Sequence, residues 1–195
     1  VVDCIRASGI ADRLLLVSFR HDLLQQAKAL MPELRIGVLT LGDLLSMMLP
    51  PPVIWQDLGL VNSMDEPLDE ENCPALKKQV GMVSSVISDK LTLIAALYPQ
   101  MSVRQILATL SAQADPAAYV RTLGFPVELV SCEYHTAFAN PEVVNQLHDA
   151  GCKAAFWTVN TEDVVRSLVP LGPDCFVTDR PDVIREWIEK AQAET

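Results

Sequence analysis

The chain alternates between two hydrophobic patterns, short unbroken apolar runs and apolar positions spaced three or four residues apart. Runs of this length are typical of strands that are buried on both faces of a sheet. The spaced positions predict amphipathic helices that cover such a sheet. The predicted strands are Leu14–Phe19, Ile36–Thr40, Val127–Cys132, Lys153–Val159 and Asp174–Thr178.

Helical spacing follows the predicted strands wherever the pattern is clear. Pro32 ends the first of these helices, because the residue before a proline disfavours helical geometry. Asn140 is a candidate N-cap with Pro141 in the first helical position, and Thr161 is a second candidate cap. Short connections between strand, helix and strand require a parallel sheet. The predicted helices cover about 23–31, 141–150, 162–168 and 181–191.

The middle of the chain, about 43–118, departs from this rhythm and contains no clear strand. It holds three consecutive prolines, Pro50–Pro52, and an acidic run, Asp65–Glu71. We expect the acidic run to be a solvated loop. A partner-docking segment or a cation site is the alternative, but no regular ligand spacing supports it. Ser102 and Gln105 are spaced as a capping box, so this region is predicted to be a helical insertion.

Continuous apolar strands covered by helices predict an α/β fold, either a barrel or an open doubly wound sheet. A complete (β/α)8 barrel needs about 250 residues, whereas this chain has 195. The residues alone leave both architectures open, with about five parallel strands and one domain over 1–195. Val1–Ala7 has the pattern of the last turns of a helix stopped by Gly9, so we expect the chain to begin within an element.

Composition narrows the possible functions. Half of the residues are apolar, 21% are charged and the net charge is −10, which predicts a globular protein and argues against nucleic-acid binding. The most apolar window, Ile36–Ile54, is interrupted by Asp43 and the prolines, which makes it a poor membrane span. The cysteines form no CxxC pair, and we expect buried free thiols in a reducing compartment such as the cytoplasm. They are Cys4, Cys73, Cys132, Cys152 and Cys175.

Three segments together resemble one enzyme family. Trp157–Asn160 resembles the WTVN segment of glycerophosphodiester phosphodiesterases, and it is reached through a helix that stops at Gly151. Asp174–Pro181 resembles the final strand of that family, with its TDRP ending. Val17–Phe19, followed by a helix and Pro32–Leu34, resembles the SSF…PEL segment. The segments occur in the order and at the strand ends that the family has.

The resemblance implies an eight-stranded TIM barrel to which this chain contributes the fourth to eighth strands. The fold class that the resemblance implies for this chain is therefore a partial TIM-type barrel. The family carries its chemistry on the first three strands, in HRG, ExD…HD and ExK motifs. The carboxylates of these motifs bind a divalent metal, Mg or Ca, and the two histidines act as acid and base. This sequence contains none of the motifs, and His21-Asp22 and His148-Asp149 lie in predicted helices. We therefore expect no catalytic residue and no metal ligand in this chain.

The resemblance also implies which residues line a substrate pocket, namely Trp157, Phe19, Ser18 and His135. Trp157 would wall the pocket near the glycerol end of the substrate, and a buried aromatic of the barrel core is the alternative. For Phe19 we favour packing over contact, and for His135 we favour a solvent-facing place at a strand end. Asn160 is expected to cap the turn into the next helix.

The sequence supports three hypotheses about the function of the protein. The first is the C-terminal portion of a phosphodiesterase that hydrolyses glycerophosphodiesters to glycerol phosphate and an alcohol. The missing strands would then come from upstream sequence or another chain, and this chain alone would be inactive. The second is a catalytically silent barrel remnant, a pseudoenzyme, in which the uncharged stretch Leu44–Pro52 and the insertion serve as docking surface. The third is a different phosphodiesterase, or an unrelated α/β fold with chance matches. We favour the first.

Overall fold

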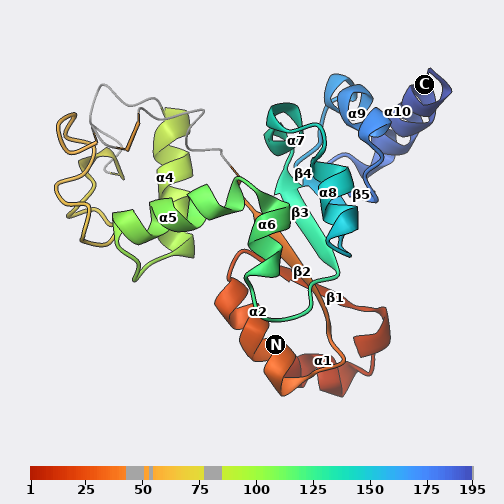
Figure 1. The fold of residues 1–195 in the computed structure, drawn as a ribbon, viewed down its shortest axis with the longest axis horizontal. Helices are drawn as coiled ribbons and strands as arrows, with labels where there is room; N and C mark the ends of the chain where they lie inside the picture. Colours follow the sequence, from red (N-terminus) through yellow and green to blue (C-terminus); the bar gives the residue numbers. More distant parts are fainter. Residues whose placement is uncertain (43–50, 53–54, 77–84, 195) are drawn as a thin grey trace. The chain divides into compact units, whose positions relative to one another are not determined.

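The computed structural model describes residues 1–42, 51–52, 55–76 and 85–194 (Figure 1). The chain forms two compact units. One unit joins Val1–Gly42 to Gln113–Thr195, and the other is Asp43–Ala112. The assignment of 1–195 to one domain with an insertion at about 43–118 stays a prediction.

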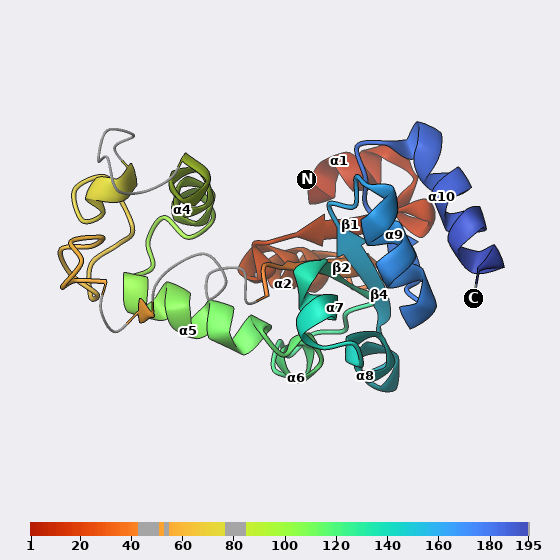
Figure 2. The same cartoon turned by 90° about the horizontal axis from the view of Figure 1, so that it is seen from above.

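Five strands form one parallel sheet in the first unit, in the order in which they occur in the chain (Figures 1 and 2). Each neighbouring pair is parallel, with Val38 opposite Val130 as one example of the register. This arrangement confirms the predicted α/β class with five parallel strands. The strands are β1 (Leu15–Ser18), β2 (Arg35–Thr40), β3 (Leu129–Glu133), β4 (Lys153–Trp157) and β5 (Cys175–Phe176).

Helices connect consecutive strands in this unit, as parallel pairing requires. The first helix ends as predicted at Gly9, whose φ of 64° is the left-handed conformation that glycine adopts most easily. The helices are α1 (Val2–Ser8), η1 (Ala11–Arg13), α2 (His21–Leu30), α6 (Pro116–Arg121), α7 (His135–Ala139), α8 (Val143–Asp149), α9 (Glu162–Leu168), η4 (Val169–Leu171) and α10 (Pro181–Ala193).

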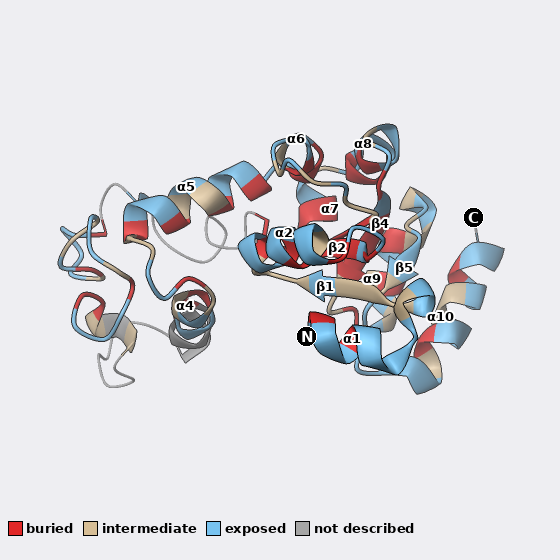
Figure 3. Ribbon diagram, turned by 90° about the horizontal axis from the view of Figure 1, so that it is seen from below, coloured by how far each residue is buried: buried red, intermediate tan, exposed pale blue. Residues whose placement is uncertain are grey.

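Alternate residues of the strands face the helices and form the core. Figure 3 shows buried positions concentrated in β2 and β4 and on the helix faces that meet them. The buried side chains come from the sheet and from α1, α2, α6, α7, α8, α9 and α10. The sheet contributes Ile36, Val38, Val130, Cys132, Ala154 and Phe156.

The opposite face of the sheet is less completely covered. Val17 of β1 is 36% exposed, and Val177, which follows β5, is 45% exposed. A Cβ at Gly37 would lie 3.2 Å from Val17 and 3.4 Å from Leu129, so glycine lets the neighbouring side chains of this face approach closely. In a closed barrel this face would line the interior.

Two element boundaries differ from the predictions. Helix α8 begins at Val143 with Glu142 as N-cap residue, and Asn140 is not its cap. The Asn140 side chain instead accepts a 3.2 Å hydrogen bond from the Glu142 backbone N–H, which forms a turn ahead of the helix. Strand β5 has two paired residues, fewer than the apolar run Asp174–Thr178 predicts.

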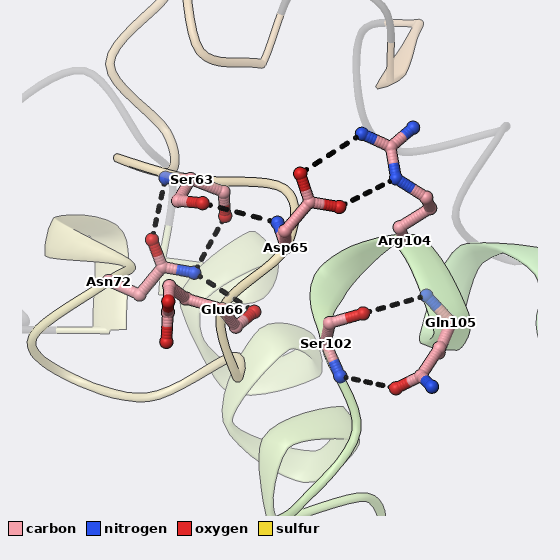
Figure 4. A network of polar contacts seen from close by, with 7 residues as sticks. All are labelled: Ser63, Asp65, Glu66, Asn72, Ser102, Arg104 and Gln105. Carbon is pink, nitrogen blue, oxygen red and sulfur yellow. Dashed lines mark hydrogen bonds and ion pairs between the residues drawn. The ribbon is translucent and has the colours of Figure 1, made fainter.

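The second unit contains η3 (Pro74–Leu76), α4 (Ser85–Leu97) and most of α5 (Val103–Gln113). The capping box is confirmed. The Gln105 side chain accepts a 2.9 Å hydrogen bond from the Ser102 N–H, and the Ser102 hydroxyl accepts a 3.3 Å bond from the Gln105 N–H (Figure 4).

The acidic run is confirmed as a solvent-facing loop, because its five carboxylate residues are all exposed. Asp65 pairs with Arg104 over 2.8 Å (Figure 4). Asp69 accepts hydrogen bonds from the backbone N–H groups of Glu71 and Asn72. Most of the docking stretch Leu44–Pro52, and part of the apolar window Ile36–Ile54, lie outside the described residues. Across the described ranges, none of the helices has the length and apolar character needed to cross a membrane.

The five cysteines are free thiols, and three of them are buried as predicted. The prediction is wrong for Cys4 and Cys175, which are exposed. Cys4 lies on the outer side of α1, and Cys175 lies on the less covered face of β5. Burial raises the pKa of the Cys132 thiol to about 12, which keeps this side chain protonated and unreactive.

Candidate functional site

The carboxyl ends of all five strands lie along one edge of the sheet, since every pair of neighbours is parallel. Proteins with sheets of this kind bind their ligands at that edge. The edge is therefore the candidate site. The residues considered at this edge lie at the strand ends or within three positions after them, namely Ser18, Phe19, Thr40, Glu133, Tyr134, His135, Trp157, Thr178 and Asp179.

Trp157, the last residue of β4, connects three parts of this edge. Its indole N–H donates a 2.9 Å hydrogen bond to the Ser131 carbonyl oxygen of β3. Its ring meets Phe19 edge-on, with ring centroids 5.3 Å apart and planes at 84°. Both aromatic side chains are half-buried. Two of the predicted pocket residues are thus in contact, and each keeps part of its surface open.

Ser18 forms the junction between β1 and α2. Its hydroxyl accepts a 3.0 Å hydrogen bond from the Arg20 backbone N–H. The Arg20 guanidinium then donates two bonds, of 2.9 Å and 2.7 Å, to the Asp22 carboxylate in the first turn of the helix. This pairing lowers the pKa of Asp22. The Ser18 hydroxyl thus takes part in the turn, and its place in a substrate pocket stays a prediction.

The junction between β5 and α10 repeats this arrangement. The Thr178 hydroxyl accepts a 2.9 Å bond from the Arg180 N–H, and Arg180 donates two bonds, of 3.3 Å and 3.5 Å, to Asp182. The sequence pattern in both places is Ser or Thr, any residue, Arg, any residue, Asp. The first and last strands of the sheet therefore turn into their helices in the same way.

Glu133 and His135 form a pair at the end of β3 that the sequence interpretation did not identify. Glu133 is the last residue of the strand, and its side chain is 8% exposed. One carboxylate oxygen accepts a 2.9 Å bond from the His135 backbone N–H, and the other lies 2.8 Å from the ring Nδ1. The sequence signal was a carboxylate at the end of an apolar strand, two residues before a histidine.

Aromatic rings surround the His135 side chain, which is 34% exposed. Tyr134 stacks on the imidazole with centroids 4.2 Å apart, and Phe138 meets it edge-on at 5.8 Å. Burial and the nearby Glu133 charge raise the pKa of Tyr134, so this phenol stays neutral. The prediction of a simple solvent-facing histidine is therefore incomplete, because the ring is held by a carboxylate and two aromatic neighbours.

Asn160 does not cap the following helix, which corrects the prediction. The residue before α9 is Thr161, and its side chain makes no capping hydrogen bond. The Asn160 amide donates a 2.8 Å bond to Asp179 Oδ2, and its carbonyl oxygen accepts bonds from the Asp179 N–H and the Thr178 hydroxyl. Asn160 therefore joins the segments that follow β4 and β5.

The residues at this edge do not fit a divalent metal by themselves. Mg²⁺ and Ca²⁺ require several oxygen ligands. Both Glu133 oxygens are engaged by His135, and one Asp179 oxygen accepts from Asn160. Within the ranges that the structure describes, no three His, Cys, Asp or Glu side chains gather where they could hold a metal ion.

Two described hollows lie away from this edge. One, of about 580 Å³, lies near the amino end of β2 and is lined by residues that include Met31, Glu33 and Arg35. The other, of about 540 Å³, belongs to the second unit and is lined in part by Leu68, Asp69 and Pro99. Neither of these two hollows is lined by a residue of the candidate site.

A parallel sheet in sequential order, covered by helices and carrying its polar and aromatic side chains at the carboxyl edge, defines a protein of the (β/α) barrel class. Residues 64–183 match the glycerophosphoryl diester phosphodiesterase family. The match covers more than half of the chain, and the chain belongs to this family. The predicted family is confirmed, and the unrelated fold is excluded.

Solved structures add a comparison of folds. A structure described as a glycerophosphoryl diester phosphodiesterase from Silicibacter pomeroyi DSS-3 is 19% identical with a TM-score of 0.52, over 96% of this chain and 42% of that chain. This chain thus spans less than half of that protein. A structure described as a glycerophosphodiester phosphodiesterase from Parabacteroides distasonis ATCC 8503 is 14% identical with a TM-score of 0.36. The alignment covers 88% of this chain and 64% of that chain. No curated protein matches the chain.

Proposed function

We propose that this chain supplies the fourth to eighth strands of a glycerophosphodiester phosphodiesterase barrel and part of the wall of its substrate pocket. The observation that carries the proposal is the sequential parallel sheet, with Trp157 and Phe19 in contact at its carboxyl edge. Ser18 shapes the β1 junction beside them, and His135 lies at the end of β3. The substrate class is a glycerophosphodiester, which the complete enzyme hydrolyses to glycerol phosphate and an alcohol.

The chemistry of the complete enzyme would come from residues outside this chain. Hydrolysis of a phosphodiester requires stabilisation of charge on the phosphoryl oxygens and a proton for the leaving alkoxide. The family is generally metal-dependent, and a divalent ion, Mg or Ca, would supply the charge stabilisation. The residues described here do not make its site, so we expect the chain alone to be inactive.

The alternative proposal is a catalytically silent interaction module, as in a pseudoenzyme. The sheet supports this alternative, because β1 and β5 are its edge strands within the described residues. Val17 in β1 and Val177 directly after β5 are both exposed. Edges and faces of this kind need a covering partner. The same feature suits the first proposal, in which the missing barrel strands cover them.

Native protein, purified from its source, distinguishes the two proposals. Its intact mass is measured first, and its hydrolysis of glycerophosphocholine with Mg²⁺ or Ca²⁺ is then compared with that of the 21.4 kDa chain. We expect a larger native protein that releases glycerol 3-phosphate and a chain that does not. A native protein of this mass without activity would support the silent module. Hydrolysis by the chain itself would refute the assignment of chemistry to residues outside it.

A further inference from the structure

Glu133 and His135 are held together more firmly than a surface ion pair. The carboxylate is almost fully buried, and both of its oxygens are bonded to the same residue, one to the backbone N–H at 2.9 Å and one to Nδ1 at 2.8 Å. His135 is the first residue of α7, so the short helix fixes its backbone directly after the strand. The orientation of the imidazole is therefore set by the protein.

This contact determines which ring nitrogen carries the proton. A carboxylate only accepts hydrogen bonds, so Nδ1 of His135 must donate to Glu133. When the ring is neutral, Nε2 then has a lone pair and accepts hydrogen bonds. The described side chains include no bonding partner for this Nε2. Part of the His135 side chain is exposed, which makes the lone pair available to a ligand at the carboxyl edge.

The other two histidines of the chain have the opposite tautomer. His148 contacts Asp174 Oδ2 through Nε2 at 2.9 Å, so its Nε2 donates. His21 is buried, and its Nε2 lies 3.0 Å from the Leu39 carbonyl oxygen, which again requires Nε2–H. Of the histidines in the sequence, His135 alone is thus arranged to offer Nε2 as an acceptor.

The charge of the Glu133–His135 pair determines whether a charged or a neutral ligand group fits beside it. With a neutral imidazole the pair carries one negative charge, and with a protonated imidazole it carries none. The buried Glu133 carboxylate and the net charge of −10 of the whole protein both disfavour an anion such as a phosphate at this place. A neutral hydrogen-bond donor, such as an alcohol hydroxyl, fits the Nε2 lone pair. The rings of Tyr134 and Phe138 flank the imidazole and suit the carbon backbone of such a ligand.

We propose that the Glu133–His135 pair binds a hydroxyl group of the glycerol moiety, with Nε2 of His135 accepting its hydrogen bond. The inference rests on the proposed function, which supplies the glycerophosphodiester. His135 would then recognise the polyol part of the substrate rather than its phosphate. Glu133 acts through His135 and is a positioning residue.

The first test does not depend on ligand. Nitrogen chemical shifts of the three imidazoles in the labelled chain report the tautomer of each ring. We expect His135 as the Nδ1–H tautomer and His148 as the Nε2–H tautomer. Glu133→Gln, which no longer presents two carboxylate oxygens, should move His135 toward the Nε2–H form. An Nε2–H tautomer for His135 in the unsubstituted chain overturns the proposal.

The second test measures binding to the native protein by titration with glycerol, glycerol 3-phosphate and inorganic phosphate, each used separately. His135→Asn is the informative variant, because its amide can still donate to Glu133 but has no atom at the Nε2 position. His148→Asn is the matched control. We expect His135→Asn to weaken binding of glycerol and glycerol 3-phosphate by about 2–10-fold, the value of one hydrogen bond, and His148→Asn to leave it unchanged.

The outcomes separate this inference from the proposed function. Binding of glycerol 3-phosphate that His135→Asn does not weaken would refute the inference and leave the proposed function standing. A response of the His135 ring to inorganic phosphate alone would assign an anion site and also refute it. Failure of the unsubstituted native protein to bind either glycerol compound would count against both.

Discussion

The side-chain amide of Asn160 donates a 2.8 Å hydrogen bond to Asp179 Oδ2, while its carbonyl oxygen accepts a 2.9 Å bond from the Asp179 backbone N–H. The two residues follow β4 and β5, where the paired part of β5 is only two residues long. Side-chain hydrogen bonds therefore extend the connection between the last two strands beyond their backbone pairing.

Replacement of Asn160 by Ala removes these bonds, and we expect the chain to lose about 1–3 kcal/mol in its free energy of unfolding. Asn145→Ala is the control, because Asn145 makes a single exposed bond to Glu142 on α8 and should cost less than about 0.5 kcal/mol. Urea unfolding of both variants measures the difference. Equal stability of the two would show that the Asn160 bonds contribute little.

His21 should make the stability of the chain depend on pH. Burial lowers the pKa of His21, and its ring is bonded to Tyr119 and to the Leu39 carbonyl. The unfolded chain therefore binds more protons than the folded chain below the ordinary value of 6.5. Stability is complete above pH 6.5 and falls as the pH decreases toward the lowered folded pKa.

The test compares urea unfolding at pH 7.5 and pH 5.5 for the unsubstituted chain and for His21→Gln. The glutamine amide can still donate to the Leu39 carbonyl but does not titrate, so we expect it to reduce the loss between the two pH values. An undiminished loss in His21→Gln would assign the pH dependence to other groups.

Trp157 should affect catalysis in the native protein, provided that this protein hydrolyses glycerophosphocholine. Trp157→Ala removes an aromatic wall at the carboxyl edge, and we expect kcat/KM to fall about tenfold, equivalent to roughly 1.4 kcal/mol of lost contact. Trp187→Phe, within α10 and not at a strand end, is the control. Unchanged kinetics in Trp157→Ala, with reduced stability, would assign Trp157 to packing alone.

The capping box of α5 should stabilise the second unit. Ser102→Ala and Gln105→Ala each remove one of two reciprocal bonds, and each should cost about 0.5–2 kcal/mol. The double variant should cost less than the sum, because the two bonds depend on each other. Ser111→Ala, at an exposed position within the same helix, should not destabilise the chain. Additive losses in the double variant would contradict the coupling.

Thiol reactivity should divide the cysteines into two classes. Cys4 and Cys175 are exposed and should react with a disulfide reagent in the folded chain, whereas the three buried thiols should react only on unfolding. Cys175 should be the slower of the pair, since burial and Asp174 raise its pKa. The variant with Ser at both positions provides the baseline. Rapid reaction of that variant would contradict the burial of at least one of Cys73, Cys132 and Cys152.

The sequence predicted the sheet well because its three middle strands are largely buried on both faces, and such strands appear as unbroken apolar runs. Boundaries were less certain where polar side chains form local turns. Asn140 has the composition of a cap but bonds to Glu142 N–H outside the helix, and Asn160 bonds to a strand end 19 residues away in the chain. A pattern of neighbouring residues contains no information about a contact of that separation.

The candidate site was predicted only in part for the same reason. Trp157 and Phe19 were recognised through the family segments that contain them, and the structure places them in contact. Glu133 was missed because a single carboxylate at the end of a strand is ordinary in sequence. Its significance depends on the direction of its side chain, toward the Nδ1 of His135, which follows from the geometry of the turn.

The matching junctions at Ser18–Asp22 and Thr178–Asp182 have an evolutionary consequence. Both use a hydroxyl to form the turn and an Arg–Asp pair to begin the helix, although β1 and β5 are the two ends of the sheet. A βα module that contains its own start signal can be copied or exchanged without redesign of its neighbours. A protein that grows by duplication of βα modules requires modules that are independent in this way.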